Sequence, residues 1–265
     1  MKIWHETTGS GQPLVLIHGW GMNAAIWDPV LDQLNTEFEV TRIDLPGHGY
    51  SEIHDGEINP STDSLFSWSE ALLKVVPDNA IWLGWSLGGS VALQAALHQQ
   101  NKIKALFMMT ATPCFAQLDD WRCAMPQTTL NKFFMNLEDN SQKTLIRFLS
   151  LQIEGCDNAR ALLKQLRIGF SSRPAVNDAM LKKGFEFLHE TDLRDQLKKI
   201  KIPMHWLFGE RDMLVPACIS GSISELVLNG PETTIEVING AGHVPFLSHF
   251  DDCIKSLKLL AEKVR

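Results

Sequence analysis

The chain has 265 residues, of which 45% are hydrophobic and 21% charged, and its formal net charge is −7. These values are typical of a globular protein with one large core, and the negative charge argues against nucleic acid as the main partner. No stretch approaches the roughly 20 apolar residues that span a bilayer, and the first residues lack the apolar segment of a signal peptide. The five cysteines are scattered and odd in number, so we expect reduced thiols in a cytoplasmic protein, with no disulfide and no zinc site.

Short apolar segments recur along the chain, with helical patterns between them. We predict strands at residues 13–19, 38–45, 80–85, 103–112, 202–210 and 233–240. We predict helices at residues 24–35, 62–76, 87–99, 217–228 and 249–263. Most of these strands are continuously apolar, which is typical of strands covered on both faces. The alternation predicts an α/β fold with an open, mostly parallel sheet, to which residues 2–8 would add an antiparallel edge strand.

Residues 114–189 interrupt this alternation. They contain four segments with apolar residues at helical spacing and no convincing strand. We interpret them as a helical cap, inserted into a core that residues 1–113 and 190–265 form. Such an insertion would cover the carboxyl-terminal edge of the sheet, where α/β proteins keep their sites. The cap holds ten Lys/Arg and eight Asp/Glu. The remainder of the chain holds 14 Lys/Arg and 23 Asp/Glu, so the cap is the more basic part.

A serine lies between small residues at the junction of a predicted strand and a predicted helix. The sequence Gly84-Trp85-Ser86-Leu87-Gly88 matches the G-x-S-x-G pattern of a nucleophile elbow. In that turn the glycines let neighbouring backbones approach, and the serine hydroxyl is lifted clear of the sheet. The alternative is a glycine-rich turn with an incidental serine. The position after a buried strand and before a helix favours the elbow.

A serine hydroxyl is a weak nucleophile until a base removes its proton, so a histidine oriented by a carboxylate should follow in the chain. Asp212 comes just after the strand at 202–210, and His243 just after the strand at 233–240. Both would share the sheet edge with Ser86. Glu210 is a nearby alternative to the aspartate, but we expect it to point away or to cap a turn. His249 is the alternative base, and we expect it to open the final helix.

An enzyme of this kind also needs two backbone N–H groups that stabilise an oxyanion. The Leu87 amide would lie at a helix N-terminus, where the helix dipole favours negative charge. The loop HGWGMN at residues 18–23 follows the first central strand and would supply the Trp20 amide as the second donor. We interpret His18 as a buried, hydrogen-bonded histidine rather than a catalytic one.

These motifs resemble the α/β-hydrolase superfamily over nearly the whole chain. The resemblance is carried by HGWGMN, DLPGHGYS (44–51), GWSLGG, GERD and GAGHVPF. The segments IWLGWSLGG, ATPCF and RFLSLQ are also similar to the family of esterases in biotin synthesis that act on pimeloyl chains carried by an acyl carrier protein. These enzymes hydrolyse the methyl ester at the far end of the pimeloyl chain and release methanol.

The resemblance implies the site residues and the partner. Catalysis would fall to Ser86, Asp212 and His243, without a metal or cofactor. Substrate contacts would be made by Trp20, Ser86, Leu87, Phe148, Leu149, Ser150, Leu151, Gln152 and His243. After RFLSLQ we expect the cap of this chain to be shorter than that of the family it resembles. The resemblance further implies a transient complex with an acyl carrier protein, and we expect a monomer without nucleic-acid or membrane partners.

Basic residues of the predicted cap also fall at helical spacing. They are Lys143, Arg147, Arg160, Lys164 and Arg167. Those within one segment would share a helix face, and a basic face beside an apolar slot suits an acidic carrier protein. The alternative is an ordinary solvated face, because acidic residues lie nearby. The residues alone leave both readings open, and the resemblance favours docking through Lys143, Arg147, Arg160 and Lys164.

The sequence also fits two other functions. A general short-chain carboxylesterase would use the same three residues, since only the cap distinguishes it. A hydrolase-fold protein that binds the acyl carrier with little catalysis belongs to another class, and the fold does not dictate function. The presence of the serine, the aspartate, the histidine and both oxyanion loops argues against the second.

Overall fold

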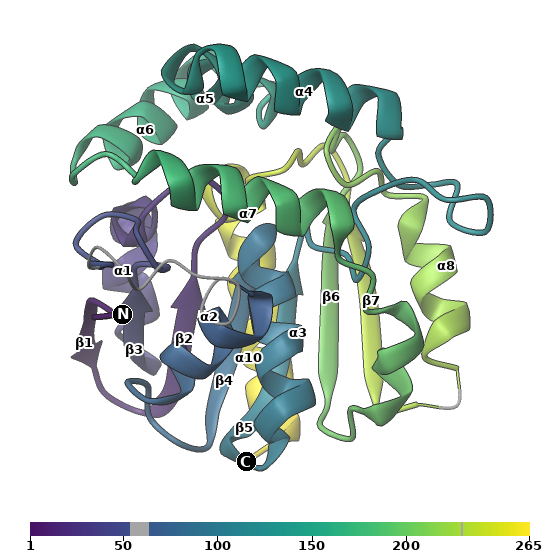
Figure 1. Ribbon diagram of the computed structural model, residues 1–265. Coiled ribbons are helices and arrows are strands. Elements are labelled where there is room, and N and C mark those ends of the chain that lie inside the picture. Colours follow the sequence, from purple (N-terminus) through teal and green to yellow (C-terminus); the bar gives the residue numbers. More distant parts are fainter. Residues whose placement is uncertain (54–63, 229) are drawn as a thin grey trace.

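The computed structural model describes residues 1–53, 64–228 and 230–265, and its centre is a seven-stranded sheet (Figure 1). The strand order is β1-β3-β2-β4-β5-β6-β7, and all neighbours pair in parallel except β1, which is antiparallel to β3. The strands are β1 (His5–Gly9), β2 (Gln12–Ile17), β3 (Phe38–Ile43), β4 (Ala80–Trp85), β5 (Ile103–Met109), β6 (Met204–Gly209) and β7 (Thr233–Ile238).

The predicted α/β fold is confirmed, including the antiparallel edge strand. Strands β4 and β6 are buried along their whole length, which explains their continuous apolar sequences. Strand β7 differs from that expectation, since most of its residues are only partly buried. The reason is its place at the end of the sheet, where only one neighbour covers it.

Helices cover both faces of the sheet (Figure 1). The core helices are α1 (Asp28–Leu34, after the 3-10 turn η1, Ala24–Trp27), α2 (Leu65–Leu73), α3 (Leu87–Gln99), α8 (Ile219–Leu226) and α10 (Phe250–Lys263). Residues 62 and 63 of the predicted helix at 62–76 lie outside the described residues. The short elements are η2 (Gln100–Lys102), η3 (Arg194–Lys199) and α9 (Pro245–Ser248), none of which was predicted.

The side chains of the central strands alternate between two core layers. In β2, Val15 and Ile17 join the cluster that contains α2, α3 and α8, whereas Leu14 and Leu16 join the cluster that contains α1 and α10. This is the period of two that strand geometry imposes. Each residue of the strand is therefore needed on one face or the other.

No helix among the described residues is long and apolar enough to cross a membrane.

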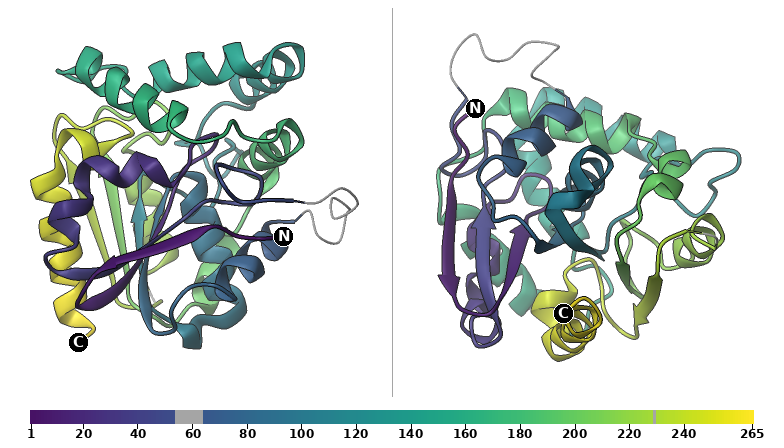
Figure 2. Two further views of the ribbon diagram at one scale, coloured as in Figure 1. Left: turned by 90° about the vertical axis from the view of Figure 1, so that its left-hand side faces the viewer. Right: turned by 90° about the horizontal axis from the view of Figure 1, so that it is seen from below.

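Four further helices lie across one end of the sheet (Figures 1 and 2). They are α4 (Gln127–Asp139), α5 (Ser141–Leu151), α6 (Ala159–Ser171) and α7 (Asp178–Glu190), and each matches a predicted helical segment. A backbone bridge between Cys114 and Asp192 joins the two chain segments on either side of these helices. We therefore propose residues 114–189 as the cap, with its base at this bridge.

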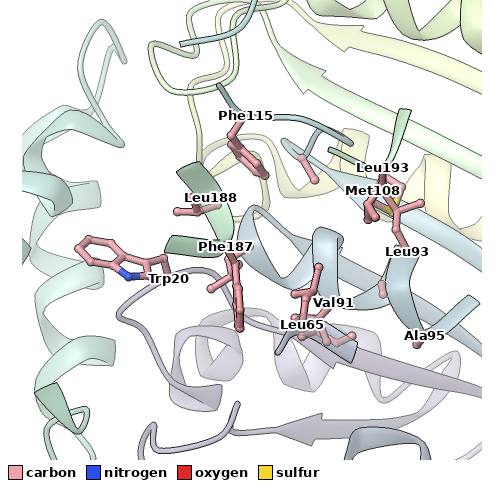
Figure 3. Close-up of a cluster of buried hydrophobic side chains, with 14 of the residues drawn as sticks. Trp20, Leu65, Val91, Leu93, Ala95, Met108, Phe115, Phe187, Leu188 and Leu193 are labelled. Atoms are coloured by element: carbon pink, nitrogen blue, oxygen red, sulfur yellow. The ribbon is translucent and has the colours of Figure 1, made fainter. Parts of the chain in front are cut away.

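The cap and the sheet share a continuous hydrophobic core. Figure 3 shows Phe187 and Leu188 of α7 in the same cluster as Met108 of β5. Trp20 reaches into the cap from the loop after β2, and its indole N–H donates to the Leu181 carbonyl at 2.8 Å. Because separating the cap would expose this apolar surface, burial holds the cap on the sheet.

A buried ion pair also fixes the cap to the core. Arg173, between α6 and α7, contacts the fully buried Asp44 at 2.8 Å and stacks on the Trp4 ring at 3.7 Å. Asp44 also accepts hydrogen bonds from the amides of Ala24 and Tyr50. The carboxylate is thus fully paired, which is the condition under which a buried charge is tolerated.

The expectation of five reduced thiols is wrong for two of the cysteines. Cys123, before the first cap helix, and Cys218, just before α8, form a disulfide with their Cα atoms 5.8 Å apart. The two residues are 95 positions apart in the sequence, so spacing gave no sign of the pair. The fold brings them together. Cys114, Cys156 and Cys253 are free and buried.

Candidate active site

Ser86 sits on a tight turn between β4 and α3. Its φ angle is +55°, in a region that non-glycine residues seldom occupy, and such strain is characteristic of functional turns. The glycines around it are required by close backbone approach. A Cβ atom on Gly84 would lie 2.5 Å from the Gly88 carbonyl oxygen, and one on Gly88 would lie 2.4 Å from the Ile17 carbonyl oxygen. The turn therefore has the geometry of the predicted nucleophile elbow.

Asp212 and His243 are joined by a short, buried hydrogen bond. The distance from His243 Nδ1 to Asp212 Oδ2 is 2.8 Å, and both side chains are essentially inaccessible to solvent. The other Asp212 oxygen accepts from the Leu214 and Val215 amides at 2.8 and 3.0 Å. The carboxylate is held by its own loop, so it can fix the orientation of the imidazole.

The backbone of His243 is held by residues next to Ser86. Its carbonyl accepts hydrogen bonds from the Trp85 indole at 2.8 Å and from the Thr110 hydroxyl at 3.0 Å. Its amide donates to the Gln152 carbonyl in the cap at 3.2 Å. The remaining ring nitrogen, Nε2, is buried and makes no hydrogen bond to any described residue. It is therefore free to accept a proton.

The loop after β2 lies directly against the serine. A Cβ atom on Gly19 would lie 3.2 Å from the Ser86 Cβ, which places the next residue, Trp20, beside the elbow. Leu87 is the first residue of α3, and its amide has no helical carbonyl to bind. These are the two amides that the sequence predicted as oxyanion donors, and both flank Ser86.

Three other residues that were considered for catalysis have structural roles. His18 is fully buried, with Nδ1 donating to the Gly19 carbonyl and Nε2 accepting from the Leu45 amide. Burial lowers its pKa to about 3, so it is neutral. Glu210 accepts a hydrogen bond from the Gly240 amide at 2.9 Å and so caps a turn, while His249 immediately precedes α10.

A cavity of about 320 Å³ lies between the cap and the sheet, with Ser86 in its wall. Its lining is mostly apolar and comes from three cap helices, the loops after β5, α5 and β6, and the turn that holds Ser86. The lining residues are Ser86, Phe115, Met125, Pro126, Thr129, Leu130, Phe133, Phe148, Leu151, Glu154, Phe185, Leu188, Met213 and Leu214. A slot of this kind fits an extended hydrocarbon chain whose reactive end lies at the serine.

The predicted cap contacts divide between this cavity and its supports. Phe148 and Leu151 line the cavity. Leu149 packs into the core cluster on the opposite side, and the Ser150 hydroxyl donates back to the Ile146 carbonyl on its own helix. Gln152 is buried, and its side-chain amide has no hydrogen-bond partner among the described residues.

Sequence reasoning missed most of the cavity wall, including Phe133 on α4 and Phe185 on α7. The segment TLNKFFMNL carried a signal, since its apolar residues repeat at helical spacing. That pattern identifies a buried face but not what the face contacts. The two phenylalanine rings stack on each other with their centres 5.7 Å apart, so the wall depends on how α4 and α7 dock.

Five basic residues on the cap helices α5 and α6 are exposed. Lys143 and Arg147 lie on the outer face of α5, and Arg160, Lys164 and Arg167 on that of α6. None of the five forms a salt bridge with a described residue. The three on α6 border a shallow surface hollow together with Leu163 and Ile168.

Comparison with known proteins decides the family. The family model for the alpha/beta hydrolase fold matches residues 12–250. The chain belongs to the α/β-hydrolase family. The structure of a bromoperoxidase from Bacillus anthracis superposes on this α/β-hydrolase with a TM-score of 0.84 at 20% identity, covering 98% of this chain and 95% of the other. At that identity the likeness shows the fold alone.

Relatives of higher identity are named as esterases. The pimeloyl-[acyl-carrier protein] methyl ester esterase of Photobacterium profundum is 40% identical to this α/β-hydrolase over 253 residues, which is 96% of each chain. The enzyme of the same name from Pseudoalteromonas atlantica is 36% identical over 252 residues, or 95% of each chain. The likeness to these esterases thus includes the cap as well as the core.

Proposed function

We propose that this α/β-hydrolase is a serine carboxylesterase that hydrolyses the methyl ester of pimeloyl-[acyl-carrier protein] in biotin synthesis. The products are pimeloyl-[acyl-carrier protein] and methanol. The observation that carries the proposal is the joint placement of Ser86, the buried His243–Asp212 pair and an apolar cavity that begins at Ser86. Relatives at 36 and 40% identity over nearly the whole chain support the substrate.

The reaction follows from the positions of these groups. Ser86 Oγ attacks the ester carbonyl carbon while His243 Nε2 takes the hydroxyl proton, and Asp212 stabilises the imidazolium that results. The Trp20 and Leu87 amides donate to the oxygen that becomes negative in the tetrahedral intermediate. His243 returns the proton to the leaving methoxide, so methanol departs. Water, deprotonated by the same nitrogen, then attacks the acyl-serine and releases the acid.

We infer that the cap lets the distal ester, and not the thioester, reach Ser86. A pimeloyl chain lying in the cavity with its methyl ester at Ser86 directs its thioester end toward the opening of the cavity. The carrier protein is too large to enter a space of about 320 Å³, so it must stay outside. The cavity then acts as a ruler that holds the labile thioester away from the nucleophile.

The exposed cations of the cap support docking of the carrier. Acyl carrier proteins are acidic, and Lys143, Arg147, Arg160 and Lys164 present unpaired positive charge on α5 and α6. Such charges act mainly on the association rate and weaken with salt. Replacing these four residues with glutamine should therefore raise KM for the carrier-borne ester and leave turnover of a small free ester unchanged.

We also propose that the protein acts as a monomer in the cytoplasm. The three buried free cysteines fit that compartment. The Cys123–Cys218 disulfide does not, because such bonds are rare in the cytoplasm. Size-exclusion chromatography with light scattering tests the oligomeric state. Thiol labelling of freshly lysed cells tests whether the disulfide exists where the protein works.

The test of function compares two substrates and two proteins. The wild-type chain and its Ser86→Ala variant are incubated with the methyl ester of pimeloyl-loaded carrier protein, and separately with a short p-nitrophenyl ester. We expect turnover of both esters by the wild type, a strong preference for the carrier-borne one, and a loss of roughly 10⁶-fold in the variant. Preference for the free ester would indicate a general short-chain carboxylesterase. Carrier binding without turnover would indicate a binding protein.

A further inference from the structure

One charged residue stands out in the wall of the acyl cavity. Among the described residues that line it, Glu154 is the only one that carries a charge. It comes three residues after Leu151, the last residue of α5. The rest of the lining is apolar apart from the hydroxyls of Ser86 and Thr129.

Glu154 lies at the opening of the cavity and not at its base. Four lining residues are exposed to solvent, namely Pro126, Thr129, Glu154 and Met213, whereas Ser86 is buried. We call these four residues the cavity opening. They come from the start of α4, the segment after α5 and the loop after β6. A chain that extends from Ser86 to this opening therefore brings its far end to the part of the cavity wall that includes Glu154.

No described residue neutralises this carboxylate. Glu154 forms no salt bridge with any residue of the described ranges, and the nearby Arg211 is already engaged by Asp157 and by the Gly155 carbonyl at 2.8 and 3.0 Å. A negative charge beside an apolar slot is screened less than one in open solvent. It will repel a second negative charge at the far end of the bound chain.

We propose that Glu154 is a specificity-determining residue that selects against esters whose far end is an anion. The proposal rests on the esterase function above and adds to it. A pimeloyl chain on its carrier has a neutral thioester at that position, whereas the free monomethyl ester has a carboxylate there. Glu154 thereby favours the carrier-borne substrate over the free acid of the same length, independently of the basic docking surface.

Two small esters isolate this effect, because neither contacts the docking surface through a carrier. Dimethyl pimelate has a neutral far end, and monomethyl pimelate has an anionic one. The measurement is the ratio of kcat/KM for the two esters in the wild type, in Glu154→Gln and in Glu138→Gln. Glu138 is an exposed carboxylate on α4 that does not line the cavity, so its variant controls for the change in net charge.

We expect the Glu154→Gln substitution to lower the dimethyl-to-monomethyl ratio by about threefold to tenfold, the range for two like charges several ångströms apart near a surface. The gain should lie in the monomethyl ester, it should shrink at high salt, and Glu138→Gln should leave the ratio unchanged. An unchanged ratio in Glu154→Gln, with both esters hydrolysed, would overturn the role of Glu154 alone. Failure of the wild type to hydrolyse either ester would overturn the esterase function together with this inference.

Discussion

Two buried histidines should make the free energy of unfolding fall steeply as the pH drops below 7. His18 and His48 are both fully buried and neutral, and burial lowers the pKa of each to about 3. In His18 one ring nitrogen donates a hydrogen bond to the Gly19 carbonyl and the other accepts one from the Leu45 amide. A second proton on the ring would face the Leu45 amide, so the charged form has no acceptor.

The magnitude follows from the difference between folded and unfolded pKa values. In the unfolded chain each histidine has a pKa of about 6.5 and binds a proton that the folded chain excludes. Stability from this source is therefore complete above pH 6.5 and is lost as the pH falls toward 3. At pH 5 each histidine lowers the free energy of unfolding by ~2 kcal/mol. Each pH unit below the unfolded-state pKa removes about 1.4 kcal/mol. Burial also lowers the pKa of His205, which acts in the same direction.

Urea unfolding at pH 7, 6 and 5 measures this loss directly. The two histidines together should remove ~4 kcal/mol between pH 7 and pH 5, a large share of a typical folding free energy. His48→Phe should reduce the loss by ~2 kcal/mol, since phenylalanine can keep the ring contact with Trp68 but cannot titrate. In the wild type, NMR should show both histidine rings unprotonated down to about pH 4. A free energy of unfolding that is equal at pH 7 and pH 5 would show that folding does not keep these rings neutral.

Three further substitutions test the elbow, the cap contact and the disulfide. Gly88→Ala should abolish esterase activity and lower Tm, because its Cβ would clash with a backbone carbonyl at 2.4 Å, and a variant with normal kcat would contradict this. Arg173→Leu should lower the free energy of unfolding by about 3 kcal/mol, since it leaves the buried Asp44 carboxylate unpaired, and denaturant titration measures that loss. The double variant Cys123→Ser, Cys218→Ser should unfold about 2–4 kcal/mol more easily than the oxidised wild type, and equal stability would show that the bond does not constrain the chain.

The core of the fold could be predicted because local sequence and global structure agree there. Strands such as β4 are apolar throughout since both faces are covered, and helices such as α3 begin where the glycine-rich turn ends. The elbow and the loops after β6 and β7 carry motifs whose backbone requirements are local. Chain order alone then placed Ser86, Asp212 and His243 at one sheet edge.

The cavity wall and the disulfide could not be predicted in the same way. Both depend on segments far apart in the sequence, such as Phe133 with Phe185, or Cys123 with Cys218. Helical periodicity showed that α4 has an apolar face, but the partner of that face is set by the docking of whole helices. In the sequence Glu154 is one of several acidic residues near the basic residues of the cap, and only its place at the cavity opening gives it a distinct role.

In the proposed reaction Ser86 reaches the distal ester while the thioester stays outside the cavity. The most direct test uses a substrate that contains both bonds, the methyl ester of pimeloyl-loaded carrier protein, and identifies the first product by intact mass. We expect methanol and a carrier that still holds its acyl chain through an intact thioester. Release of the free carrier thiol before the methyl ester is cleaved would contradict it.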